Sequence, residues 1–167
     1  MEKLNELTEF IKAQARELAK NEEHCPMLFV ITPDRGVGIT PISGFDKDHF
    51  QEIVSNGLRR EGATGYVLVN EAWMAKFVGD KKSKSFSDSP WLGKLLKGEI
   101  SVSELPPDDR IEALMLTSVE NGKSYVVWQA KIEYSTDGRR IIGSWEKIID
   151  TAGNIGKLDG RLVLKSW

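Results

Sequence analysis

The sequence predicts one α+β domain over residues 1–167, built from a mainly antiparallel sheet with two or three helices packed on one face. Three observations predict it: an apolar stripe of helical period near the N-terminus, a turn signal inside 27–42, and two reversals in the last third, at Asn121-Gly122 and Asp137-Gly138. With 167 residues, of which 40% are hydrophobic and 29% charged, the chain is long enough to bury one core.

The first predicted elements are a helix and a β-hairpin. Apolar residues recur every three or four positions from about Glu2 to Lys20, which is typical of an amphipathic helix. Two apolar runs then flank Pro33-Asp34-Arg35-Gly36, where Pro presets the backbone for a turn and Gly tolerates positive φ. Because Pro41 has no amide hydrogen to donate, the second strand should lie at a sheet edge or end at this residue. The runs are MLFVIT (27–32) and VGITPI (37–42).

A second helix should begin at Asp46 as its N-cap and end at Gly62. Asp48 and His49 fall in its first turn, where an acid complements the helix dipole, so a structural role competes there with a catalytic one. Its apolar face would carry Phe50, Ile53, Val54 and Leu58.

The two later reversals predict strand registers, if each is a two-residue type I′ turn. The first then sets Trp128 opposite Met115, at the centre of a continuous apolar face, and the second sets Gln129 beside Glu146. This register also predicts three opposite-charge pairs across the strands, each contributing roughly 0.2–1 kcal/mol. They are Arg110 with Glu133, Glu112 with Lys131, and Glu120 with Lys123.

The run YVLVNEAWMAKFV (66–78) carries two polar residues, Asn70 and Glu71, in an apolar context. As a regular strand it aligns Glu71 with Val69 and Trp73 on one face, which predicts a partly buried carboxylate. A break near Asn70 would instead turn Glu71 outward. Both interpretations stay open at this point.

A catalytic interpretation would use Glu71 together with His49 or Asp48, as in a small hydrolase or a nucleic-acid-acting enzyme. No local spacing supplies a partner, a nucleophile or a metal motif, and a buried charge that is paired for structural reasons explains the same pattern. We favour the structural interpretation. The sequence predicts no metal site and no cofactor.

The segment from about 79 to 109 is predicted to be a mobile insert, because it is rich in Lys and Ser and poor in bulky aliphatic residues. A short helix should follow Ser89-Pro90. Lysines interspersed with Phe86 and Trp91 are also typical of an anion or single-stranded nucleic-acid contact, with a solvated loop as the competing interpretation. The candidate lysines are Lys81, Lys82, Lys84, Lys94 and Lys97.

The charge balance and the cysteine content bound the surroundings of the protein. Lys and Arg number 23 and Asp and Glu number 25, so no overall basic field attracts nucleic acid or anionic lipid. The single cysteine, Cys25, cannot form an intramolecular disulfide, which suits a reducing cytoplasm. No apolar run has the length of a membrane span or the form of a signal peptide. We therefore expect a cytoplasmic protein without a membrane partner.

VNEAWM (69–74) followed by LPPDDRIEALML (105–116) resembles a group of uncharacterised prokaryotic proteins, in which an EAWM strand precedes a P-x-D-R-x-E-A-L strand. The resemblance covers 65 to about 132. It implies a protein of a prokaryote or its mobile elements and implies no activity.

The sequence favours a non-catalytic binding or scaffold protein, which would bind itself as a homodimer or bind another protein. Two alternatives remain: an enzyme that uses Glu71, and anion or nucleic-acid binding through the lysines.

Overall fold

The computed structural model describes residues 2–23, 26–42, 49–75, 91–150 and 166–167. Three helices lie in this part of the chain, together with two short 3-10 turns, and none of these helices combines the length and apolarity that crossing a bilayer requires. They are α1 (Glu2–Ala19), α2 (Phe50–Arg60), α3 (Leu92–Leu96), η2 (Val102–Glu104) and η3 (Pro107–Asp109).

The described strands form one sheet in which every pairing is antiparallel. Its strand order is β2-β1-β3-β4-β5-β6, and β7 also pairs with β5. This confirms the predicted α+β class. The strands are β1 (Met27–Thr32), β2 (Gly36–Pro41), β3 (Gly65–Ala75), β4 (Arg110–Glu120), β5 (Tyr125–Tyr134), β6 (Arg140–Ile142) and β7 (Glu146–Asp150).

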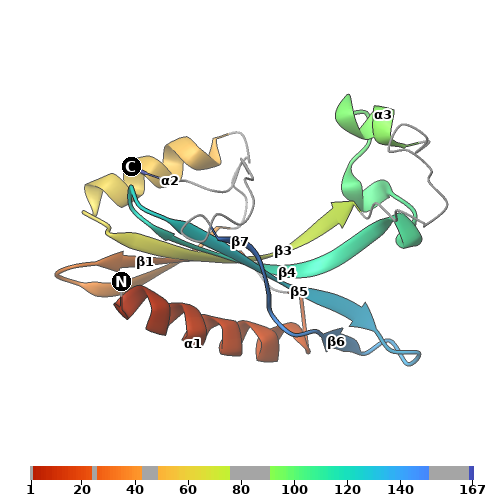
Figure 1. Cartoon of the computed structure of the whole chain (residues 1–167), viewed down its shortest axis with the longest axis horizontal. Helices are drawn as coiled ribbons and strands as arrows, with labels where there is room; N and C mark the ends of the chain where they lie inside the picture. The colour runs from red at the N-terminus through yellow and green to blue at the C-terminus, as the bar shows by residue number, and fades with distance from the viewer. Residues whose placement is uncertain (1, 24–25, 43–48, 76–90, 151–165) are drawn as a thin grey trace.

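The two long helices cover opposite faces of this sheet, with α1 below it and α2 above it in Figure 1. The prediction that the helices share one face is therefore wrong. The reason lies in β3, whose residues Gly65 to Val69 are all buried, so both of its faces need cover. On one face Ile11 and Ala15 pack against Val67 and Val69; on the other, α2 packs against residues that include Tyr66 and Leu68.

Two hydrogen bonds from α1 fix its position on the sheet. The Thr8 hydroxyl lies 3.1 Å from the Ser118 hydroxyl of β4, and both residues are buried. One turn further along the helix, the Trp145 indole donates to the Lys12 carbonyl (3.0 Å). Trp128 packs against the same apolar cluster with Lys12 Nζ 5.1 Å from its ring centroid, as expected for a residue at the centre of this face.

The first late reversal has three residues rather than two, and this corrects the predicted register. The Glu120 amide donates to the Ser124 carbonyl (2.9 Å), and the Lys123 amide donates to the Glu120 carbonyl (3.0 Å). The extra residue shifts β4 by one position, so that Leu116 and not Met115 lies opposite Trp128. Since a one-residue shift exchanges the faces of a strand, it places Leu114 and Leu116 under α1, where both are fully buried.

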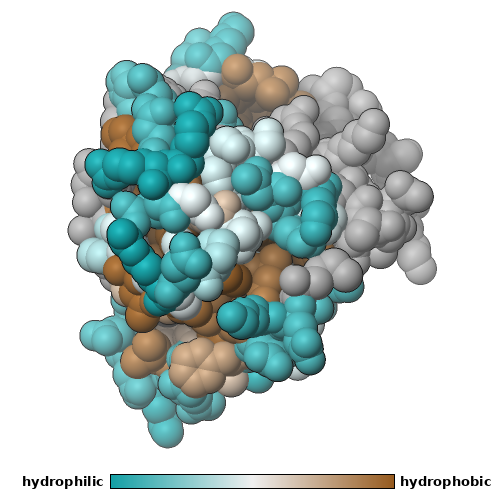
Figure 2. All heavy atoms as spheres, turned by 90° about the vertical axis from the view of Figure 1, so that its left-hand side faces the viewer, coloured by the Kyte–Doolittle hydropathy of each residue, from teal (hydrophilic) through white to brown (hydrophobic). Residues whose placement is uncertain are grey.

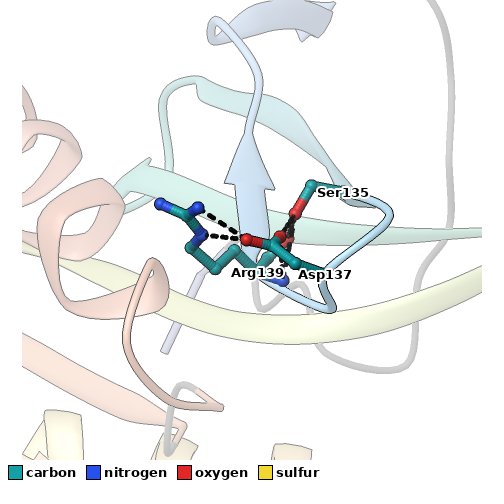
Figure 3. Close-up of polar contacts among 3 residues, drawn as sticks. All are labelled: Ser135, Asp137 and Arg139. Atoms are coloured by element: carbon teal, nitrogen blue, oxygen red, sulfur yellow. Dashed lines mark hydrogen bonds and ion pairs between the residues drawn. The ribbon is translucent and has the colours of Figure 1, made fainter.

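The second reversal also has three residues, between Ser135 and Arg139. Figure 3 shows the Asp137 carboxylate held between these two side chains, with Arg139 Nε 2.6 Å from Asp137 Oδ2. The hydrogen bond from Arg139, and then that from Ser135, lowers the pKa of the Asp137 carboxyl. Gly138 adopts φ 82°, which is the left-handed conformation that this turn requires.

The shifted register keeps one of the predicted ion pairs and removes the other two. Glu120 and Lys123 form an ion pair (2.5 Å), and Gln129 lies beside Glu146 (3.5 Å), as predicted. The pairs of Arg110 with Glu133 and of Glu112 with Lys131 were predicted wrongly, because the added loop residue sets Glu112 opposite Ile132 and Lys131 opposite Ala113.

Other predictions fall partly or wholly outside the described residues. Asp46, the expected N-cap of α2, is one of these, and His49 occupies the N-cap position in the structure. Residues 79–90 of the predicted insert are not described. The remainder contains α3 at the predicted place, and Trp91, which precedes α3, is buried with its indole donating to Asp109 (2.9 Å).

Two glycines should respond in opposite ways to substitution by alanine. A Cβ at Gly65 would lie 2.9 Å from the Val119 carbonyl oxygen, so Gly65→Ala should lower the free energy of unfolding by about 1–3 kcal/mol. A Cβ at Gly57, inside α2, would meet no atom within 4 Å, and Gly57→Ala should raise it by about 0.5–1 kcal/mol. Urea unfolding followed by circular dichroism checks both, and equal effects would contradict the described packing of β3.

Candidate functional site

A groove of about 520 Å³ lies between the edge strand β2 and helix α2. Figure 2 views the molecule from the end at which the β1–β2 turn lies, and it shows hydrophobic residues at the surface between hydrophilic ones. Ile53, which was predicted to lie on the apolar face of α2, is 46% exposed in the groove wall. The groove is lined mainly by apolar residues, among them Val30, Ile39, Ile42, Ile53, Val54 and Leu58.

The groove is hollow because small residues of β2 face α2. Gly38 pairs with Val30, which belongs to the apolar cluster under α2, so Gly38 points to the same face. Across the groove, Gly57 of α2 also lacks a side chain. A Cβ at either glycine would meet no atom within 4 Å. The two glycines thus leave a space that larger residues would fill.

The backbone of β2 is available for hydrogen bonding on its outer side. The Ile42 amide donates to the Pro26 carbonyl (2.8 Å) and marks one hydrogen-bonded pair of the β1–β2 ladder. Such pairs recur at every second residue, so Gly38 bonds to β1 while Val37 and Ile39 direct their amides and carbonyls to the free edge. The missing amide hydrogen of Pro41 also falls on this outer side, as the sequence predicted for an edge strand.

The two edges of the described sheet are protected to different degrees. On the far side, β6 has only three residues, and the pairing of β7 with β5 shifts register beside Trp128. Short strands and bulges hinder the addition of another strand. By contrast, β2 is regular, exposed at all six positions and free of charged residues. The β2 edge is therefore the better surface for pairing with another chain.

Charges gather at one end of the groove. Arg35 Nη1 lies 2.9 Å from the Glu61 carboxylate, and Arg60 Nε lies 3.6 Å from the same carboxylate. Two guanidinium groups thus share one carboxylate, which leaves a positive excess at this end. Both arginine side chains are about four-fifths exposed, so the excess charge is accessible to a ligand.

Glu71, the candidate catalytic acid, is held in an ion pair. β3 pairs with β4 without a break at Asn70, so Glu71 stays on the α1 side of the strand and is partly covered, as the regular-strand interpretation predicts. Its carboxylate lies 2.7 Å from Arg140 Nη2, and the two side chains are only 6% and 11% exposed.

Further polar and aromatic residues surround this ion pair on the same stretch of sheet. Glu112 lies 3.8 Å from Arg140 and accepts a hydrogen bond from the Tyr134 hydroxyl (2.9 Å). Arg110 stacks over the Trp73 ring, 4.3 Å from its centroid. Sequence reasoning missed Arg140 and Tyr134, because only the true register of β5 and β6 brings them to Glu71. A carboxylate in line with apolar residues of a strand was the one available signal that a cation would be near it.

The other candidate residues are distributed away from Glu71 or lie outside the description. His49 is exposed at the start of α2, and among the described residues Glu71 pairs with Arg140 and not with His49. Lys94 and Lys97, in and just after α3, are exposed. The candidates outside the described residues are Asp48, Lys81, Lys82 and Lys84.

In the part of the chain that the structure describes, no three His, Cys, Asp or Glu side chains are grouped as a metal site would require. Comparison with known proteins gives no match: no family model fits the sequence, and no curated protein or solved structure is significantly similar to the chain. The geometry of the two sites therefore carries the functional argument.

Breaking the buried ion pair should be costly for stability. Arg140→Met leaves the Glu71 carboxylate buried without its cation and should lower the free energy of unfolding by about 3 kcal/mol. Arg139→Met, which removes an exposed ion pair with Asp137, is the matched control and should change it by less than about 0.5 kcal/mol. Chemical unfolding measures both. Equal losses in the two variants would show that Glu71 does not depend on Arg140.

Tyr134 should ionise above the ordinary tyrosine value of 10.0. Burial raises its pKa first, and the hydrogen bond to Glu112 raises it further, so Glu112→Gln should lower this pKa only part of the way. Because the pKa is raised in the folded state, the stability that Tyr134 contributes is complete below about pH 10 and is lost as the pH rises through the folded-state pKa. The difference between the absorbance titrations of the wild type and of Tyr134→Phe measures the pKa of Tyr134. An unchanged pKa in Glu112→Gln would contradict the hydrogen bond between Tyr134 and Glu112.

Proposed function

We propose that the protein is a non-catalytic binding module whose binding surface is the groove between β2 and α2. The observation that carries this proposal is the coincidence of an uncharged, exposed edge strand with an apolar hollow beside it. Edge strands that add a partner strand obtain affinity from backbone hydrogen bonds and specificity from pockets for alternate side chains. We place the protein in the cytoplasm as part of the same proposal, since its one cysteine suits a reducing compartment.

The condition of Glu71 supports a binding function over a hydrolytic one. General acid–base catalysis requires a titratable group within hydrogen-bond reach of the substrate. Glu71 is almost fully buried, and its carboxylate is bonded to Arg140. The same ion pair joins β3 to β6, two strands that are not neighbours in the sheet, so it has a structural use without any chemistry.

Selection from a random peptide display library tests the proposed function. Peptides enriched on the wild-type protein should bind at least about tenfold more weakly to Gly57→Leu, because the new side chain occupies the hollow. Fluorescence anisotropy measures the dissociation constants.

Gly93→Leu is the matched control, since Gly93 is also a helical glycine whose Cβ would meet no atom within 4 Å, but it lies in α3 and not in the groove. Its affinity for the selected peptides should equal that of the wild type, and circular dichroism verifies that both variants fold. A library that yields no ligand, or ligands that bind Gly57→Leu as well as the wild type, would refute the proposed function.

A further inference from the structure

We infer that the groove binds an extended segment of another protein, which pairs antiparallel with β2, carries bulky aliphatic residues at alternate positions and ends in an acidic residue. This inference rests on the proposed function and names the class of partner. Three features of the described residues define that class: the outward backbone groups of β2, the hollow over Gly38, and the positive end of the groove.

The backbone of β2 selects an extended partner. Val37 and Ile39 each direct an amide and a carbonyl to the free edge, two residues apart. Only a strand presents donors and acceptors with the same repeat. Both residues are also about half exposed, at 48% and 58%, so a partner strand would cover apolar surface there as well.

The hollow selects the partner's side chains. In an antiparallel pair, directly opposite residues point to the same face, so the partner residue opposite Gly38 points towards α2 and enters the groove. Gly38 and Gly57 leave space for it, and Ile53 and Val54 supply apolar walls. A Leu or Ile fits this position, and its neighbours in the partner point to the other face.

The charge at the groove's end selects the partner's last residue. Arg35 lies one residue beyond Gly36, at the start of β2, and an antiparallel partner reaches it at the C-terminal end of the paired segment. Arg35 and Arg60 share the Glu61 carboxylate, so an acidic residue of the partner would balance the remaining positive charge.

A second copy of the chain satisfies the edge less well. Antiparallel pairing of two β2 strands about Gly38 would join Val37 of one copy to Ile39 of the other and satisfy their backbone groups. However, the residues that such a copy turns towards α2 are Gly36, Gly38 and Thr40, which are too small to fill the groove. An unfilled apolar hollow forfeits the packing contacts that favour association, and the geometry therefore favours a different chain.

The test uses a fluorescent, amidated hexapeptide of sequence Leu-Thr-Leu-Thr-Leu-Glu, in which the threonines lie opposite Ile39 and Val37. We expect saturable binding, with the amide resonances of Val37 and Ile39 shifted in NMR spectra. N-methylation of both threonines removes the donors that face β2 and should weaken binding by about tenfold or more. N-methylation of the first two leucines, whose amides face away from β2, is the matched control. It should change the dissociation constant by less than about threefold.

The outcomes separate the two proposals. In one outcome, Gly57→Leu abolishes binding of both the selected library peptides and the hexapeptide, while the two methylation patterns weaken hexapeptide binding equally. The groove then binds ligands, and strand addition is overturned. If neither the library nor the hexapeptide yields a ligand, both proposals fail. Analytical ultracentrifugation tests for a dimer. If the protein dimerises, and Ile39→Pro dissociates the dimer whereas the hexapeptide leaves it intact, the edge binds a second copy and the inference is overturned. Gly93→Leu controls for indirect effects in each assay.

Discussion

The uninterrupted pairing of β3 with β4 is the constraint on which the rest of this structure depends. The register runs without a shift from Gly65 opposite Glu120 to Ala75 opposite Arg110. Because these strands lie in the middle of the sheet, α1 and α2 can each cover one face of them, and the first five residues of β3 are buried on both sides. The position of every other element follows from that two-sided core.

The same constraint explains why polar residues interrupt the apolar run of β3. After Val69 the strand contains residues that are half buried or exposed, and Asn70 and Glu71 mark the change. A carboxylate at this boundary is still shielded from water, so it needs a cation nearby. Arg140 supplies it from β6, which is separated from β3 by two strands in the sheet order, and links the middle of the sheet to its far edge. The ion pair therefore belongs to the architecture of the sheet.

The sheet is also asymmetric at its edges, and this asymmetry relates the fold to a function. The far edge is divided between β6 and β7, whereas β2 continues the sheet as a regular strand with Gly, Val, Ile, Thr and Pro alone. Glycine at position 38 contributes little to the stability of the β1–β2 pairing, because it has no side chain to pack against Val30. The missing side chain leaves the groove open above Gly38, and this open space is the physical basis for the proposal that the edge binds a partner.

Local patterns in the sequence determined the elements of this protein: α1 from its three-and-four spacing, the β1–β2 hairpin from Pro33 and Gly36, and the two later reversals from Gly122 and Gly138. They did not determine the length of those reversals, because Asn-Gly suits a two-residue and a three-residue loop alike. Only tertiary structure decided between them, since one register packs Leu114 and Leu116 into the cluster under α1 and the other would turn them to the face that α2 covers. It likewise decided that the helices lie on opposite faces and that Glu71 meets Arg140. A contact between residues far apart in the chain depends on the summed geometry of every turn between them, and no single stretch of sequence carries that information.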